Sequence, residues 1–296
     1  MRRPSYLSVN LKEIKEKAVA LLENCRLCPR ECGVNRLRDE KGHCRTGRYA
    51  VISSYGPHFG EEPELVGHSG SGTIFFSNCN LNCLFCQNYE ISQLGEGREK
   101  NEEELARMML YLQDIGCHNI NLVSPTHIVP QFLEALLVAV KEGLRIPIVY
   151  NTGGYDKVET LKLLEGVVDI YMPDAKYSDE GNARRYSNAP NYFSINKLAI
   201  KEMHRQVGDL ICDERGIAQR GLLIRHLVLP NRIAGSFRVL EFIAQEVSRD
   251  SYVNIMAQYR PCYRAHLYLE LSRRITEKEY NEVVEYARSL GLHRGF

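Results

Sequence analysis

The sequence predicts an α/β fold of repeated parallel strand–helix units that follows a small cysteine-rich extension. From Thr73 onward, short runs rich in β-forming residues alternate with longer runs of helical periodicity, which is typical of parallel βα units. Ahead of these units, four of the ten cysteines lie between Cys25 and Cys44. A chain of 296 residues has room for one large domain with such an appendage.

Six segments carry few charges, as expected of strands that are covered on both faces. They are residues 73–77, 119–123, 146–150, 168–172, 222–229 and 252–257. The longest gap separates the fourth and fifth segments, and turn residues at 214–216 predict a small hairpin within it.

The helices between these strands have readable ends. Asn101 precedes Glu104 by three residues and Thr276 precedes Glu279 by three, the spacing of a capping box at a helix start. Glycines are placed where helices should stop, at Gly116, Gly143, Gly166 and Gly291.

The amino-terminal part has a different character. Apolar residues within 11–22 recur at helical spacing, whereas from Cys25 to Gly47 the periodicity disappears and glycine and proline punctuate the chain. This stretch has little hydrophobic core of its own, so a bound metal would supply cross-links. We therefore expect a module of helix and cysteine-rich segment at 1–60 and the α/β unit at 61–296.

Composition excludes several classes of protein. Hydrophobic residues make up 44% and charged residues 25%, as in folded globular proteins. The net charge of +1 does not indicate a nucleic-acid-coating surface. Charged residues interrupt the amino terminus where an export signal needs an apolar run, and no stretch has the length of a membrane span. We expect a cytoplasmic protein without nucleic-acid or membrane partners.

Three cysteines directly follow the first predicted strand, in the order Cys79-x3-Cys83-x2-Cys86. Three thiolates at the carboxyl end of a strand can hold three corners of an iron–sulfur cube and leave the fourth iron open. A structural zinc site needs a fourth protein ligand, so the triplet fits zinc less well. Such a cysteine triplet would suit an enzyme that binds a ligand at the open iron. The alternative is a protein without enzymatic activity, either an iron–sulfur electron carrier or a zinc-stabilised binding module.

The triplet, with aromatic Phe85 before its last cysteine, resembles the cluster motif of the radical S-adenosylmethionine (SAM) superfamily. The segments 25–33, 88–92 and 172–176 are more narrowly similar to the pyruvate formate-lyase activating enzyme-related group. The resemblance implies a partial (β/α)6 barrel that binds a 4Fe-4S cluster and SAM. It implies reductive cleavage of SAM to a 5′-deoxyadenosyl radical that abstracts hydrogen from a substrate, with a glycyl residue of a partner protein as one candidate.

The same resemblance implies roles for residues at strand ends. Phe85 would lie near the adenine, and Lys176 is similar to a residue that pairs with the methionyl carboxylate. Where many relatives have Gly-Gly-Glu, this chain has Ser124-Pro125-Thr126, so the usual carboxylate is missing. The other expected cofactor-binding residues are Asn151, Asp174 and Gln258. A low-potential flavodoxin or ferredoxin is the expected electron donor.

The remaining clustered cysteines have ligand spacing of their own, Cys25-x2-Cys28-x3-Cys32-x11-Cys44. Four thiolates in a core-poor segment suit either a structural zinc or a second iron–sulfur cluster, and thiolate sites accept both. The spacing predicts a bound metal without choosing between them.

Overall fold

The six predicted strands form the parallel part of one mixed sheet. In the computed structural model, which describes residues 2–296, the strand order is β3-β1-β2-β4-β5-β6-β8-β7, with β9 paired to β8. Consecutive pairs from β2 through β9 along β2-β4-β5-β6-β8-β9 are parallel. The strands are β1 (Ala50–His58), β2 (Ser71–Phe76), β3 (Arg98–Lys100), β4 (Ile120–Val123), β5 (Ile148–Thr152), β6 (Ile170–Pro173), β7 (Ile211–Cys212), β8 (Ala218–Leu227) and β9 (Tyr252–Met256). All six predicted segments are confirmed to within four residues at either end.

Two further strands, β1 and β3, were not predicted. β1 runs antiparallel to β2 on one side and to the short β3 on the other, which makes the sheet mixed. Its second half carries Gly56 and Pro57, residues that mark turns in sequence patterns. The structure accommodates Pro57 because β3 pairs only with Ala50–Ile52, so this part of β1 is at the sheet edge, where a missing N–H is tolerated.

Ten α-helices lie along residues 2–296, most of them between successive parallel strands. They are α1 (Leu11–Ala20), α2 (Pro63–Val66), α3 (Tyr89–Ser92), α4 (Glu102–Asp114), α5 (Val129–Lys141), α6 (Val158–Leu163), α7 (Glu180–Ser187), α8 (Tyr192–Val207), α9 (Ser236–Phe242) and α10 (Glu277–Ser289). Both expected capping boxes are present, at α4 and α10. The four glycines expected at helix ends all have positive φ. The helix starts and ends could be predicted from the sequence because capping boxes and helix-end glycines depend on local backbone geometry alone.

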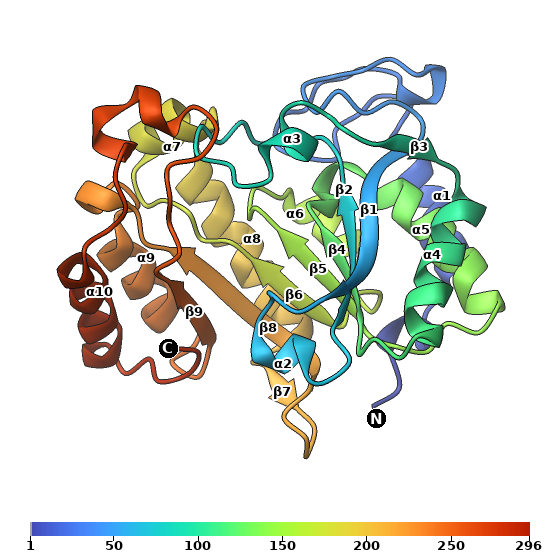
Figure 1. Ribbon diagram of the computed structural model, residues 1–296. Helices are drawn as coiled ribbons and strands as arrows, with labels where there is room; N and C mark the ends of the chain where they lie inside the picture. The colour runs from blue at the N-terminus through green and yellow to red at the C-terminus, as the bar shows by residue number, and fades with distance from the viewer. Residues whose placement is uncertain (1) are drawn as a thin grey trace.

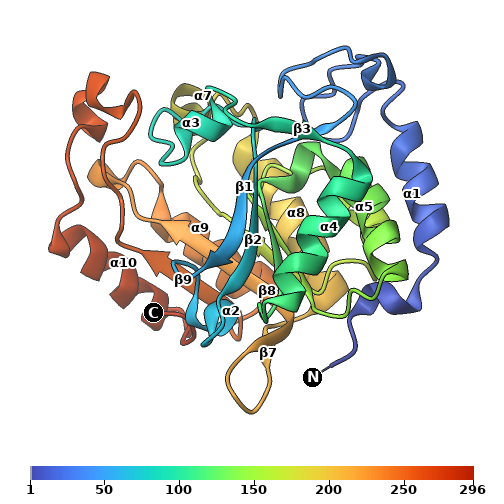
Figure 2. The ribbon, with the colours of Figure 1, turned by 45° about the vertical axis from the view of Figure 1, so that its right-hand side comes forward.

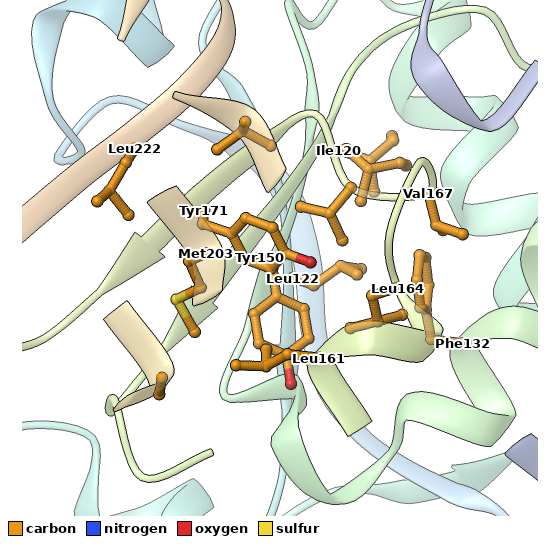
Figure 3. Packing of buried hydrophobic residues seen from close by; sticks show 14 of the residues in the cluster. Ile120, Leu122, Phe132, Tyr150, Leu161, Leu164, Val167, Tyr171, Met203 and Leu222 are labelled. Atoms are coloured by element: carbon orange, nitrogen blue, oxygen red, sulfur yellow. The ribbon is translucent and has the colours of Figure 1, made fainter. Parts of the chain in front are cut away.

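The main hydrophobic core lies between the sheet and its helices. Figure 3 shows Leu122, Tyr150 and Tyr171 of three neighbouring strands meeting Leu161 from α6 and Phe132 from α5. Every one of these side chains is fully buried. This packing fixes the parallel strands, and with them the loops at their carboxyl ends.

The amino-terminal segment lies against the helices and beside those loops. α1 packs on α5 and α6, while the cysteine-rich loops that follow it lie next to β3 and α3 in both ribbon views (Figures 1 and 2). Its own apolar cluster among the described residues contains three buried side chains, Leu22, Cys25 and Leu27. β1, which falls inside the expected 1–60 module, is a strand of the central sheet.

The predicted hairpin is formed by β7 and the start of β8, which pair antiparallel. It projects from the amino-terminal end of β8, on the far side of the sheet from α3 (Figure 1). Across residues 2–296 we find no helix with the length and apolar character needed to cross a membrane.

Candidate active site

Each of the three cysteines that follow β2 has a hydrogen-bonding group within reach of its sulfur atom. The Leu81 backbone N–H donates to Cys79 Sγ over 3.4 Å, and the Ser187 hydroxyl donates to Cys83 Sγ over 3.0 Å. Cys86 Sγ lies 3.1 Å from the Ser92 hydroxyl. Donors aimed at sulfur favour the thiolate, which is the form that binds metal.

Burial acts in the opposite direction on these thiols. It raises the pKa of Cys79 to about 12 and that of Cys86 to about 11, and it also raises the pKa of Cys83. A buried thiolate therefore needs a positive charge beside it, and a bound metal supplies one. Lys176 is near enough to lower all three pKa values in part.

The arrangement suits a cluster better than a single ion. Within residues 2–296, no three Cys, His, Asp or Glu side chains are grouped so that they could hold one metal ion. An iron–sulfur cube does not require this, because each cysteine binds a different iron. The residues present therefore fit the cube that the cysteine spacing predicts.

The cysteines open onto a cavity of about 390 Å³ at the carboxyl ends of the parallel strands. This is where open α/β sheets place their ligands. Most of the predicted site residues line it, namely Cys79, Cys83, Phe85, Cys86, Ser124, Asn151, Asp174, Lys176 and Gln258. The structure thus brings together residues from the loops after β2, β4, β6 and β9 and from the carboxyl end of β5.

Two of the expected cofactor-binding residues lie elsewhere. Pro125 and Thr126 are buried outside the cavity lining. The Thr126 hydroxyl donates to Asp156 over 2.8 Å and lies 3.0 Å from the Thr152 hydroxyl. Because this hydroxyl is engaged in a buried network, it holds the loop after β4 and does not face the cavity.

A chain of charged side chains crosses one wall of the cavity. Asp174 accepts from Lys176 Nζ at 2.5 Å and from Arg225 Nε at 2.9 Å. Arg225 also donates to the Asn151 side-chain oxygen at 2.7 Å and lies 3.5 Å from the carboxylate of Glu61. Two cations and two anions therefore share one partly buried network.

The network keeps Asp174 and Lys176 charged. Burial by itself raises the pKa of Asp174, but Arg225 and Lys176 outweigh it, and the net pKa of this carboxyl is lowered. Burial likewise disfavours the charged Lys176, yet Asp174 and the Cys83 thiol raise its pKa above the usual value. The cavity thus offers a fixed ammonium and a fixed carboxylate near neutral pH.

Arg225 and Glu61 were missed by the sequence reasoning. The signal for Arg225 was present, since it is a lone charge in an otherwise apolar predicted strand. Glu61 follows β1, and without that strand nothing placed it near the cysteines.

The amino-terminal cysteines occupy a separate place. Cys25, Cys28, Cys32 and Cys44 together line a second, narrower cavity. The structure therefore brings together all four residues that their spacing singled out. Cys117, Cys212 and Cys262 line neither cavity.

An α/β sheet whose first parallel strand leads into three cysteines at the rim of a polar cavity defines the class of SAM-cleaving iron–sulfur enzymes. A family model described as the radical SAM superfamily matches residues 73–215, which span β2 to the β7–β8 hairpin. The chain belongs to the radical SAM superfamily. This membership indicates an enzyme that cleaves SAM with an iron–sulfur cluster, and not a passive electron carrier or binding module.

One relative by sequence and one solved structure extend the comparison. The chain is 36% identical over 298 residues to the uncharacterized protein MJ0674 of Methanocaldococcus jannaschii, covering 97% of this chain and 81% of that protein. It resembles the crystal structure of a radical SAM methyltransferase from Sphaerobacter thermophilus with a TM-score of 0.52 and 13% identity, over 75% of this chain. The matched part spans 64% of the methyltransferase, and the likeness concerns the fold.

Proposed function

We propose that this chain generates a 5′-deoxyadenosyl radical from SAM and uses it to abstract a hydrogen atom, as the pyruvate formate-lyase activating enzymes do. One observation carries the proposal: three cysteines, each with a hydrogen-bonding group close to its sulfur, open onto one polar cavity. Cys79, Cys83 and Cys86 would hold a 4Fe-4S cluster, which supplies the electron for homolytic cleavage of the sulfonium bond.

The cavity residues would bind and orient SAM. The Lys176 ammonium suits the methionyl carboxylate, because its pKa is raised and it stays protonated. Asp174, with its lowered pKa, offers a carboxylate for the methionyl amine from the loop after β6, in a chain that lacks the Gly-Gly-Glu carboxylate after β4. Ser124, Asn151 and Gln258 add further oxygen acceptors to the cavity lining.

Phe85 would define the adenine end of the site. It is 6% exposed and packs edge-on against Tyr177 and Tyr259, so its ring is fixed. The six parallel strands would curve into a partial barrel that keeps water from the radical.

The proposed hydrogen donor is a glycyl residue of a partner protein, which would make the chain an activating oxidoreductase. The support is the resemblance of residues 25–33, 88–92 and 172–176 to the activating enzyme-related group. The remaining proposals are a flavodoxin or ferredoxin as electron donor, a cytoplasmic location, and a metal at the amino-terminal cysteines.

The test is an anaerobic assay after reconstitution with iron and sulfide. Dithionite-reduced wild type should convert SAM to 5′-deoxyadenosine, and Cys83→Ala should not. Cys212→Ala is the matched control, because Cys212 lies on the β7–β8 hairpin at the other end of the sheet and should retain full turnover. A reducible, fully loaded wild-type cluster that forms no 5′-deoxyadenosine would refute the proposal.

A further inference from the structure

The four amino-terminal cysteines surround one small space. Three of them are almost fully buried, with Cys25 at 8%, Cys28 at 7% and Cys44 at 7% exposure, while Cys32 is exposed. All four residues line the same small cavity. All four are free thiols.

A buried cation stands beside this space without a matching charge. Arg36 is 1% exposed and lines the same cavity. Its Nε donates to the Gly47 carbonyl at 3.1 Å, and its Nη1 donates to the His127 carbonyl at 2.7 Å and approaches Cys25 Sγ at 3.9 Å. Nη2 has no hydrogen-bond partner among residues 2–296.

A buried guanidinium without a negative partner is costly. Backbone carbonyls offset only part of that cost, and protonated thiols carry no charge. Four thiolates bound to a metal centre would carry a net negative charge and would remove the imbalance. Arg36 therefore indicates that the cavity is built for metal-bound thiolates.

The two kinds of metal site differ in how closely the sulfurs must converge. Zinc holds four sulfurs at about 2.3 Å from one point, so the thiols must converge. The amino-terminal cysteines do not form such a group in the described part of the chain, and neither do Cys79, Cys83 and Cys86. An iron–sulfur cube does not require that convergence, because each thiolate binds a different iron.

We propose that Cys25, Cys28, Cys32 and Cys44 ligate a second 4Fe-4S cluster, in which every iron is bound by a protein thiolate, and that Arg36 compensates its negative charge. Without an open iron, this cluster cannot bind SAM. The inference extends the metal proposed above at these cysteines, and it does not depend on whether the chain activates a glycyl protein.

Hydrogen bonds connect this site to the loop that carries the other three cysteines. The Thr46 hydroxyl donates to the Cys44 carbonyl at 3.2 Å and accepts from the Asn78 side chain at 3.2 Å. Asn78 directly precedes Cys79. The Arg30 Nε also donates to the carbonyl of Asn80, at 2.9 Å. The two cysteine sets are therefore held against each other by polar contacts.

The first test counts metal in the whole, anaerobically reconstituted chain. Wild type should hold about eight iron and about eight sulfide and no zinc, as two cubes require. A variant with Cys79, Cys83 and Cys86 all replaced by alanine should keep about four iron, and the electron paramagnetic resonance spectrum of its reduced cluster should not respond to SAM.

Other outcomes overturn the proposal. About four iron with one zinc in the wild type would show that the four amino-terminal cysteines bind zinc. About four iron without zinc would show that these cysteines bind no metal. The wild-type count decides even where a variant fails to fold. Four iron with normal 5′-deoxyadenosine formation would refute the second cluster alone, whereas eight iron without SAM cleavage would refute only the proposed function.

The second test separates Arg36 from a merely structural residue. Arg36→Gln removes a positive charge beside the second cluster, so its reduction potential should become more negative while the potential of the SAM-binding cluster stays unchanged. Arg36→Lys should restore most of the shift. Arg38→Gln is the control, because Arg38 is exposed on the same short 3-10 helix (Arg36–Arg38). Identical potentials in Arg36→Gln and wild type would exclude charge compensation.

Discussion

Replacing Asp174 by asparagine should destabilise the protein strongly, because this carboxylate serves two cations. Lys176 and Arg225 lie 2.5 Å and 2.9 Å from its oxygens, and the side chains of Arg225 and Asp174 are only 18% and 14% exposed. Removing one partner of a buried ion pair costs about 3–5 kcal/mol, since the remaining charge stays uncompensated. For a chain of this size that corresponds to a fall in melting temperature of about 6–20 °C.

The measurement is thermal unfolding by circular dichroism at pH 7 and one scan rate. Asp250→Asn is the control, because its carboxylate is 72% exposed, and it should change the melting temperature by less than about 2 °C. The double variant Asp174→Asn/Arg225→Met should recover part of the loss, since it also removes an uncompensated charge. If Asp174→Asn had the same melting temperature as Asp250→Asn, the charged network would contribute nothing to stability, and this reasoning would be wrong.

The dependence of the free energy of unfolding on acidic pH is a second measurement of the effect of the Asp174 carboxyl. Its folded-state pKa is lowered, so its stabilisation is present above the unfolded value of about 3.9 and is lost as the pH falls through the folded value. Asp174→Asn should therefore show a shallower loss of stability below about pH 4 than the wild type does.

Three further predictions concern other parts of the molecule. Lys176→Met should weaken SAM binding about tenfold or more in anaerobic calorimetry, because a charge-assisted hydrogen bond contributes about 1.5–3 kcal/mol; an unchanged Kd would remove Lys176 from the site. Gly42→Ala would place a Cβ 2.8 Å from Cys32 Sγ and should reduce metal content, whereas Gly56→Ala, with nothing within 4 Å, should not; equal content would contradict this. Burial lowers the pKa of His226 to about 4, so the wild type should lose stability as the pH falls from about 6.5 towards 4, and His226→Asn should lose less in urea titrations at pH 7 and pH 5; parallel losses would count against it.

The parallel strands and the cysteine loop were predictable because each depends on a short stretch of sequence. An apolar run without charges indicates a strand that is buried on both faces, whatever its neighbours are. Cys79, Cys83 and Cys86 lie so close in sequence that one loop must carry them all. The first strand and its loop therefore followed directly from the residues.

The charged wall of the cavity was not predictable, because it depends on the order of strands in the sheet. Asp174 and Arg225 are bridge partners only because β8 lies next to β6, although fifty-one residues separate them in the chain. The role of Arg36 was hidden for the same reason, since its partner His127 belongs to the short 3-10 helix after β4. Pro125 and Thr126 were assigned to the cofactor from their neighbourhood, and the Asp156 network that turns Thr126 inward could not be read from local pattern.

The contacts of the cysteine-rich segment also constrain how the protein is assembled during synthesis. This segment leaves the ribosome first, yet its partners come much later: the Leu27 carbonyl accepts from Thr160, and Arg30 donates to the carbonyl of Asn188. The four thiols therefore stay exposed to solvent until more than half of the chain has emerged from the ribosome. Insertion of the metal proposed at these cysteines would therefore come late in folding, and a fragment of residues 2–47 would lack the later partners Thr160 and Asn188.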